Sequence, residues 1–116
     1  MDYKESLLMV VKKWNSDPIE DEWIFEKFRE DVVGGMSAPE AFLAIEETVG
    51  ILLNEQDEST SIEIVQTIIG LALRSQTTEL PKSLRDNRGE IRMKFSKFGG
   101  YAKDKLDELY KYYRLG

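Results

Sequence analysis

The amino-acid sequence predicts an all-α fold, with residues 1–116 forming one domain of five to six helices in antiparallel hairpins. Apolar residues recur at intervals of three and four in several segments, and no segment alternates apolar and polar residues with period two. Polar stretches with Gly, Pro or Ser separate these segments. A chain of 116 residues is long enough to bury a core without disulfides or metal. HEAT-like helix pairs are compatible with this pattern.

The most apolar segment is SIEIVQTIIGLALR, residues 61–74. On a helical wheel one broad face holds Ile62, Val65, Ile68, Ile69, Ala72 and Leu73. Ile64 and Leu71 extend that face on one side, so we expect this helix at the centre of the fold. Thr60, with Glu63 three residues later, is expected to cap it. The segment is too short and too polar to cross a bilayer.

Two helices are predicted before residue 34. The first spans residues 2–14, with an apolar stripe formed by Tyr3, Leu7, Val10, Val11 and Trp14. The second spans residues 18–33, where Asp17 is expected to be the N-cap and Glu20 to complete a capping box. Gly34 and Gly35 are expected to end this helix in the usual glycine C-cap manner.

Trp23 points away from the predicted core stripe of the second helix. One interpretation packs Trp23 with Ile19 against the first helix. The other leaves it exposed among acidic residues, a composition typical of binding hot spots.

The third helix follows the clearest capping box of the sequence, formed by Ser37 and Glu40, and extends to Asn54. With the central helix it should form a hairpin. Gly50 lies on the side away from the core, where it would permit close approach of a neighbour.

Two further helices are predicted, over residues 81–98 and 101–115. Gly89 is a point where the first of them could divide. The core face of the last helix consists of Ala102, Leu106, Leu109, Tyr110 and Tyr113.

The composition excludes several chemistries. The chain has no cysteine and no histidine, which removes thiol nucleophiles, zinc–thiolate sites and the commonest general base. No phosphate-binding glycine loop is present. Glu46 and Glu47 are followed by Gly50 where a carboxylate magnesium site would need a third acid. From these absences we expect a protein that is not an enzyme and uses no cofactor or metal. The N-terminal residues lack the charge order of a secretory signal, so we expect a cytoplasmic protein.

Charge is distributed unevenly along the chain. Residues 15–63 hold fourteen acidic residues against Lys27 and Arg29, a net charge of −12, whereas residues 74–116 have a net charge of +5. The acidic part should repel nucleic acid and attract basic proteins, unless it is simply a solvated surface. The bases of residues 82–97 are scattered round the predicted helix. They are therefore interpreted as partly neutralising the acidic half rather than as a nucleic-acid site.

Residues 75–81, SQTTELP, and the closing YAKDKLDELYKYYRL resemble small acidic helical proteins from bacterial toxin–immunity systems. The preceding helix–acidic loop–helix segment is similar as well, so the resemblance covers residues 37–115. It implies a stoichiometric inhibitor of a toxin, often a nuclease, whose basic cleft an acidic protein would fill.

The leading hypothesis is a non-enzymatic protein-binding module, an immunity protein that occludes the basic cleft of a toxin with an acidic surface. The predicted partner-binding residues are Glu20, Trp23, Glu26, Glu30, Asp31, Glu46, Glu47, Glu55, Asp57 and Glu58. The alternative is a helical scaffold or regulatory adaptor that binds a partner helix in an apolar groove. Neither hypothesis involves nucleic acid or a membrane.

Overall fold

A computed structural model describes residues 2–16 and 21–115, and within these ranges the chain is helical and contains no strand. The elements are α1 (Tyr3–Trp14), α2 (Ile24–Phe28), the π-helix η1 (Arg29–Val33), α3 (Ala38–Asn54), α4 (Glu58–Ser75), α5 (Lys82–Phe95) and α6 (Gly100–Tyr112). The all-α prediction is confirmed. In the described part of the chain, no helix combines the length and the apolar character needed to cross a membrane.

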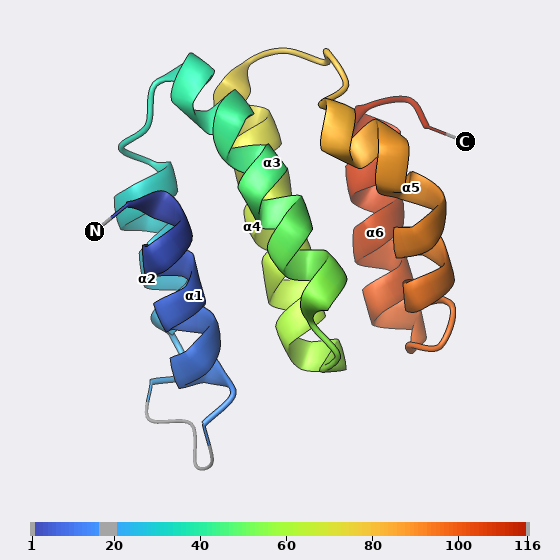
Figure 1. The fold of residues 1–116 in the computed structure, drawn as a ribbon, viewed down its shortest axis with the longest axis horizontal. Helices are drawn as coiled ribbons and strands as arrows, with labels where there is room; N and C mark the ends of the chain where they lie inside the picture. The colour runs from blue at the N-terminus through green and yellow to red at the C-terminus, as the bar shows by residue number, and fades with distance from the viewer. Residues whose placement is uncertain (1, 17–20, 116) are drawn as a thin grey trace.

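The helices form two layers (Figure 1). α1, α3 and α5 lie side by side in the front layer, and α2, η1, α4 and α6 lie behind them. The molecule measures 37 × 34 × 19 Å, so it is a slab whose thickness matches two helices of about 10 Å each. α3 and α4 occupy the middle of the slab and contact the helices on both sides.

The core confirms α4 as the central helix, although its buried face differs from the predicted one. Ile64 and Leu71 are fully buried, whereas Leu73 is 61% exposed. Because α3, η1 and α6 all contact α4, the buried arc extends to the side of Ile64 and Leu71 and leaves Leu73 uncovered. All five predicted core residues of the last helix are buried: Ala102, Leu106, Leu109, Tyr110 and Tyr113.

Two helix starts can be compared with their predicted caps. The capping box of Ser37 and Glu40 is present, with each side chain accepting the backbone N–H of the other. α4 begins earlier than predicted, because the Asp57 carboxylate accepts the N–H of Thr60 at 2.9 Å. Thr60 is therefore inside the first turn and is not the cap.

The second helix departs most from the prediction. The proposed cap at Asp17 and Glu20 falls outside the described residues. Asp21 accepts the N–H of Trp23 at 3.0 Å, just before α2 begins at Ile24. The α-helix is short and continues as the π-helix η1, in which the N–H of Gly34 donates to the carbonyl of Arg29 at 2.9 Å.

Gly34 is the C-cap residue that ends η1, as expected, but it lacks the left-handed backbone usual for a glycine C-cap. Gly34 has a right-handed φ of −61°, and the described glycines include none with positive φ. The left-handed C-cap lies instead at Gln76, where φ is 58°. Gly89 does not divide the fifth helix, since α5 continues through it.

Candidate functional site

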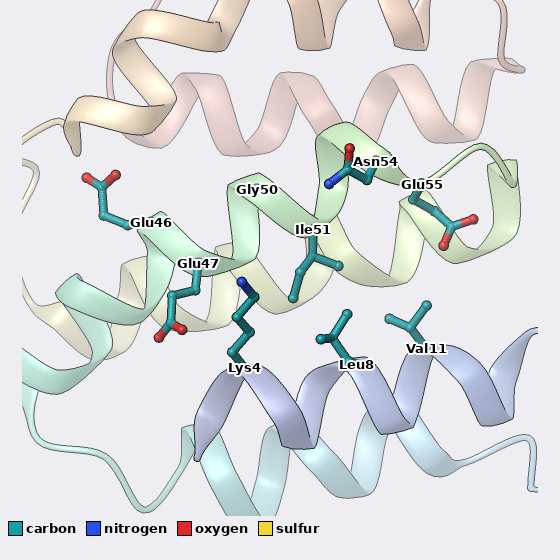
Figure 2. Close-up of a pocket in the computed structure, with 9 residues that line it drawn as sticks. All are labelled: Lys4, Leu8, Val11, Glu46, Glu47, Gly50, Ile51, Asn54 and Glu55. Atoms are coloured by element: carbon teal, nitrogen blue, oxygen red, sulfur yellow. The ribbon is translucent and has the colours of Figure 1, made fainter. Parts of the chain in front are cut away.

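A groove of about 600 Å³ lies in the front layer, between α1 and α3 (Figure 2). Its lining consists of Lys4, Leu8, Val11, Glu46, Glu47, Gly50, Ile51, Asn54 and Glu55. The close-up shows Leu8 and Val11 of α1 facing Ile51 of α3, which makes the floor apolar. Leu8 is 45% exposed, although α1 contacts both α2 and α3.

Gly50 keeps the groove wide. A Cβ built at Gly50 would meet no heavy atom within 4 Å, and the residue lies in the interior of α3 with right-handed backbone. No described residue of the chain makes the close approach that Gly50 was expected to permit. The space beside Gly50 is empty, and its position in the lining makes it part of the groove.

The rim of the groove carries acidic residues and one lysine. Glu47 is exposed and points toward α1, whereas Glu46 points away from α1. Lys4 extends from α1 toward Gly50. With Glu46, Glu47 and Glu55 against Lys4, the lining has a net charge of −2.

Outside the groove lining, α1 is joined to α3 by a part-buried pair of hydroxyl groups. The Tyr3 hydroxyl lies 2.7 Å from Thr48 Oγ1, which itself donates to the carbonyl of Ala44. The Tyr3 hydroxyl is therefore the donor in this pair. Burial raises the pKa of Tyr3 to about 12, and the negative charge of Glu47 acts in the same direction.

Several predicted partner-binding acids bind the protein itself. Glu46 accepts the N–H of Ser83 in the first turn of α5, at 3.2 Å, and Glu58 accepts the N–H of Gly99 before α6, also at 3.2 Å. The N-caps of these two helices, Pro81 and Gly99, offer no side-chain cap of their own. Each helix therefore takes its capping carboxylate from the central pair of helices.

Glu55 and Asp57 also have roles within the chain. Glu55 accepts the side-chain amide of Asn15 at 3.3 Å and two N–H groups of its own loop. Asp57 caps α4, as described above. Within the groove, Glu47 is consequently the acid whose carboxylate forms no hydrogen bond or ion pair to another described residue.

Glu26 lies on α2, Glu30 and Asp31 lie on η1, and Trp23 immediately precedes α2, all away from the groove. Trp23 is 57% exposed, in agreement with the exposed alternative, whereas its expected packing partner Ile19 lies outside the described residues. Glu26, Glu30 and Asp31 are exposed as well, and Glu20 lies outside the described residues. The structure thus divides the predicted surface into a front groove and a strip on the back layer.

In the described part of the chain, no base of α5 forms an ion pair with the acidic half. Lys94 nevertheless interacts electrostatically with Glu55 and donates to the carbonyl of Leu52 at 2.5 Å, in agreement with partial neutralisation. Arg85 pairs with Asp86 at 3.2 Å, and Arg92 pairs with Asp107 at 2.6 Å while lying over the Tyr110 ring. These contacts stay within the C-terminal part of the chain. Among residues 2–16 and 21–115, no three carboxylates come close enough to hold a metal ion.

The sequence-based reasoning missed the apolar half of the groove. Leu8 belongs to no predicted stripe, and neither Val11 nor Ile51 is among the predicted partner-binding residues. One signal was present: Leu8 and Met9 are adjacent apolar residues outside the core stripe of α1, and both are partly exposed. Comparison with protein-family models, with curated proteins and with solved structures found no match.

Proposed function

We propose that this protein is a non-enzymatic protein-binding module whose α1–α3 groove receives a basic, partly apolar segment of a partner. The observation that carries the proposal is the combination of an apolar floor, an acidic rim and an empty space beside Gly50 in one groove. Apolar side chains exposed in a concave surface and rimmed by charge are typical of interaction sites.

Each part of the groove would contribute differently to binding. Burial of Leu8, together with the exposed part of Val11, would provide most of the affinity, at about 25 cal/mol for each Å² removed from water. The unpaired Glu47 would attract lysine or arginine of the partner and raise the association rate at low salt. Lys4 would disfavour a second basic residue at the α1 side.

We further propose that the partner is a toxin domain and that the protein acts as its immunity protein. The acidic charge of residues 15–63 and the resemblance of residues 37–115 to toxin–immunity proteins support this identity. Exposed Trp23, with Glu26, Glu30 and Asp31, would form a second contact on the back layer. α1 lies between this strip and the groove, so a partner that contacts both would have to wrap around α1.

The arrangement of the helices suits such a role. We propose that α1 with α2–η1, α3 with α4 and α5 with α6 are antiparallel, HEAT-like pairs of a short solenoid. Contacts of α1 with α3 and of α3 with α5 in one layer, and of η1 and α6 with α4 in the other, support this arrangement. Stacked pairs present long grooves between parallel neighbours, which suits recognition of elongated segments.

The test fills the groove and leaves the fold intact. Gly50→Trp places a large ring in the empty space, and Gly89→Trp is the matched control, because Gly89 is also helical, exposed and free of contacts. Full-length protein is immobilised and exposed to lysate of the native cells, and captured proteins are identified by mass spectrometry. We expect a basic partner that Gly50→Trp loses and Gly89→Trp retains.

Charge and apolar variants separate the two functional hypotheses. For an immunity protein, Glu47→Lys should weaken capture and make it less sensitive to salt. For an adaptor that relies on apolar contact, Leu8→Ala should weaken capture while Glu47→Lys changes little. Capture of the same proteins by wild type and Gly50→Trp would contradict the use of the groove altogether.

A further inference from the structure

The two walls of the α1–α3 groove are helices, and this limits what can bind between them. Helical walls have their backbone N–H and C=O groups bonded within each helix, so they offer no donors or acceptors to a partner backbone. An extended segment in this groove would leave its own backbone groups unpaired, whereas it could pair them at a sheet edge. A helix satisfies its backbone bonds internally and brings only side chains to the contact.

The groove side chains are spaced for helix packing. On α1 the lining residues Lys4, Leu8 and Val11 follow the helical repeat, and on α3 Glu47, Gly50 and Asn54 do the same. A row of side chains from a third helix, spaced at four residues, can fit between two such rows. From residue 46 to residue 55 the groove extends for roughly 13 Å along α3, enough for more than two helical turns.

Gly50 sits at the middle of this length and requires a separate explanation. Its φ is not positive, and its missing side chain makes room for no other described residue of the chain. Glycine inside a helix lowers stability, so alanine would serve the free protein better. A close crossing of another backbone is the remaining packing role for glycine at this position.

We infer that the occupant of the groove is an amphipathic, basic α-helix of the partner, which crosses α3 at Gly50. This inference rests on the proposed function and specifies the segment that the groove recognises. Apolar residues of that helix contact Leu8, Val11 and Ile51, and a lysine or arginine reaches Glu47. The backbone of the bound helix comes closest to α3 at Gly50.

The experiment uses the full-length protein and two fluorescent peptides of leucine and lysine. One peptide can form an amphipathic helix, and the other has the same pattern with a central proline that prevents it. Binding is measured by fluorescence anisotropy, and the site is located from shifts of the backbone amide signals of residues 46–55 in nuclear magnetic resonance spectra.

We expect the helical peptide to bind at the groove and the proline peptide to bind about tenfold more weakly or not at all. Gly50→Ala should lower the affinity for the helical peptide by about tenfold, since even one methyl group obstructs a close crossing of two helices. Gly89→Ala should leave binding unchanged. Thermal unfolding of Gly50→Ala should show a more stable protein, which excludes misfolding as the cause of weaker binding.

The outcomes separate this inference from the proposed function. Two results would overturn the inference that a helix occupies the groove but would keep the groove as a docking site. One is equal binding of both peptides; the other is wild-type affinity of Gly50→Ala together with loss of binding in Gly50→Trp. Absence of binding, or binding unaffected by Gly50→Trp, would overturn both. Light scattering that shows a dimer disrupted by Gly50→Trp would identify a second copy of this chain as the occupant, and would also overturn the inference.

Discussion

Replacement of Gly34 by alanine should destabilise the protein, although Gly34 has an ordinary right-handed backbone. A Cβ at this position would lie 2.3 Å from the carbonyl oxygen of Glu30, well inside the shortest approach that real Cβ atoms make. The close approach arises from the π-turn, in which Gly34 bonds the carbonyl of Arg29, five residues earlier. The glycine is therefore required by crowding from the chain's own backbone.

The loss of stability in Gly34→Ala can be estimated from the backbone contacts that the new methyl group would disturb. The contact involves backbone, so no side chain can rotate to relieve it. Loss of the Gly34–Arg29 hydrogen bond would cost about 0.5–1.5 kcal/mol. Strain in the turn would add about 1–3 kcal/mol. Alanine recovers about 0.5–1 kcal/mol through a less flexible unfolded chain, so we expect a net loss of about 2 kcal/mol.

Urea unfolding followed by circular dichroism gives the free energy of unfolding directly. We expect Gly34→Ala to lower the midpoint at an unchanged slope, and Gly89→Ala, whose Cβ meets nothing within 4 Å, to raise stability by about 0.5–1 kcal/mol. Gly34→Ala should also weaken the ion pair of Arg29 with Glu63 on α4, in which the guanidinium lies 3.2 Å from the carboxylate. A Gly34→Ala protein as stable as the wild type would refute the crowding argument.

Three other changes have expected outcomes. Burial raises the pKa values of Tyr3 and Tyr110 to about 12, so the stability from their protonated forms is complete below about pH 10 and is lost as pH rises toward 12. Urea midpoints at pH 8 and pH 11 should therefore differ, and less so in Tyr3→Phe. Glu46→Ala should cost about 1 kcal/mol because α5 loses its cap, whereas Glu46→Gln should cost less; equal losses in thermal melts would contradict this. Gln76→Gly should raise the melting temperature, since it removes a left-handed strain of about 1 kcal/mol.

Features set by neighbouring residues were predictable from the sequence. The capping box at Ser37 and Glu40 depends on residues three apart, and its structure matches the prediction. The start of α4 was placed late because Thr60 and Asp57 both have capping side chains, and a pattern alone does not decide between them. The π-turn of η1 was missed, because its apolar pattern resembles that of an α-helix.

The groove and the roles of its acids depend on residues far apart in the chain. Glu46 and Ser83 are 37 positions apart, and no local pattern links them. The acidic residues were recognised as a group by charge, yet four of them bind groups of the chain itself. Gly50 was noticed, but whether it faces a neighbour or a groove depends on where α1 packs.

The capping of α5 and α6 by Glu46 and Glu58 has a consequence for the order of folding. The first turn of a helix that is capped by a residue of another helix is fully stabilised only once that other helix has formed. We therefore expect α3 and α4 to form before α5 and α6. Truncated fragments should reflect this dependence, with residues 37–115 retaining more helix than residues 81–115 alone. Mutations in α3 and α4 should accordingly slow folding, whereas mutations in α6 should mainly speed unfolding.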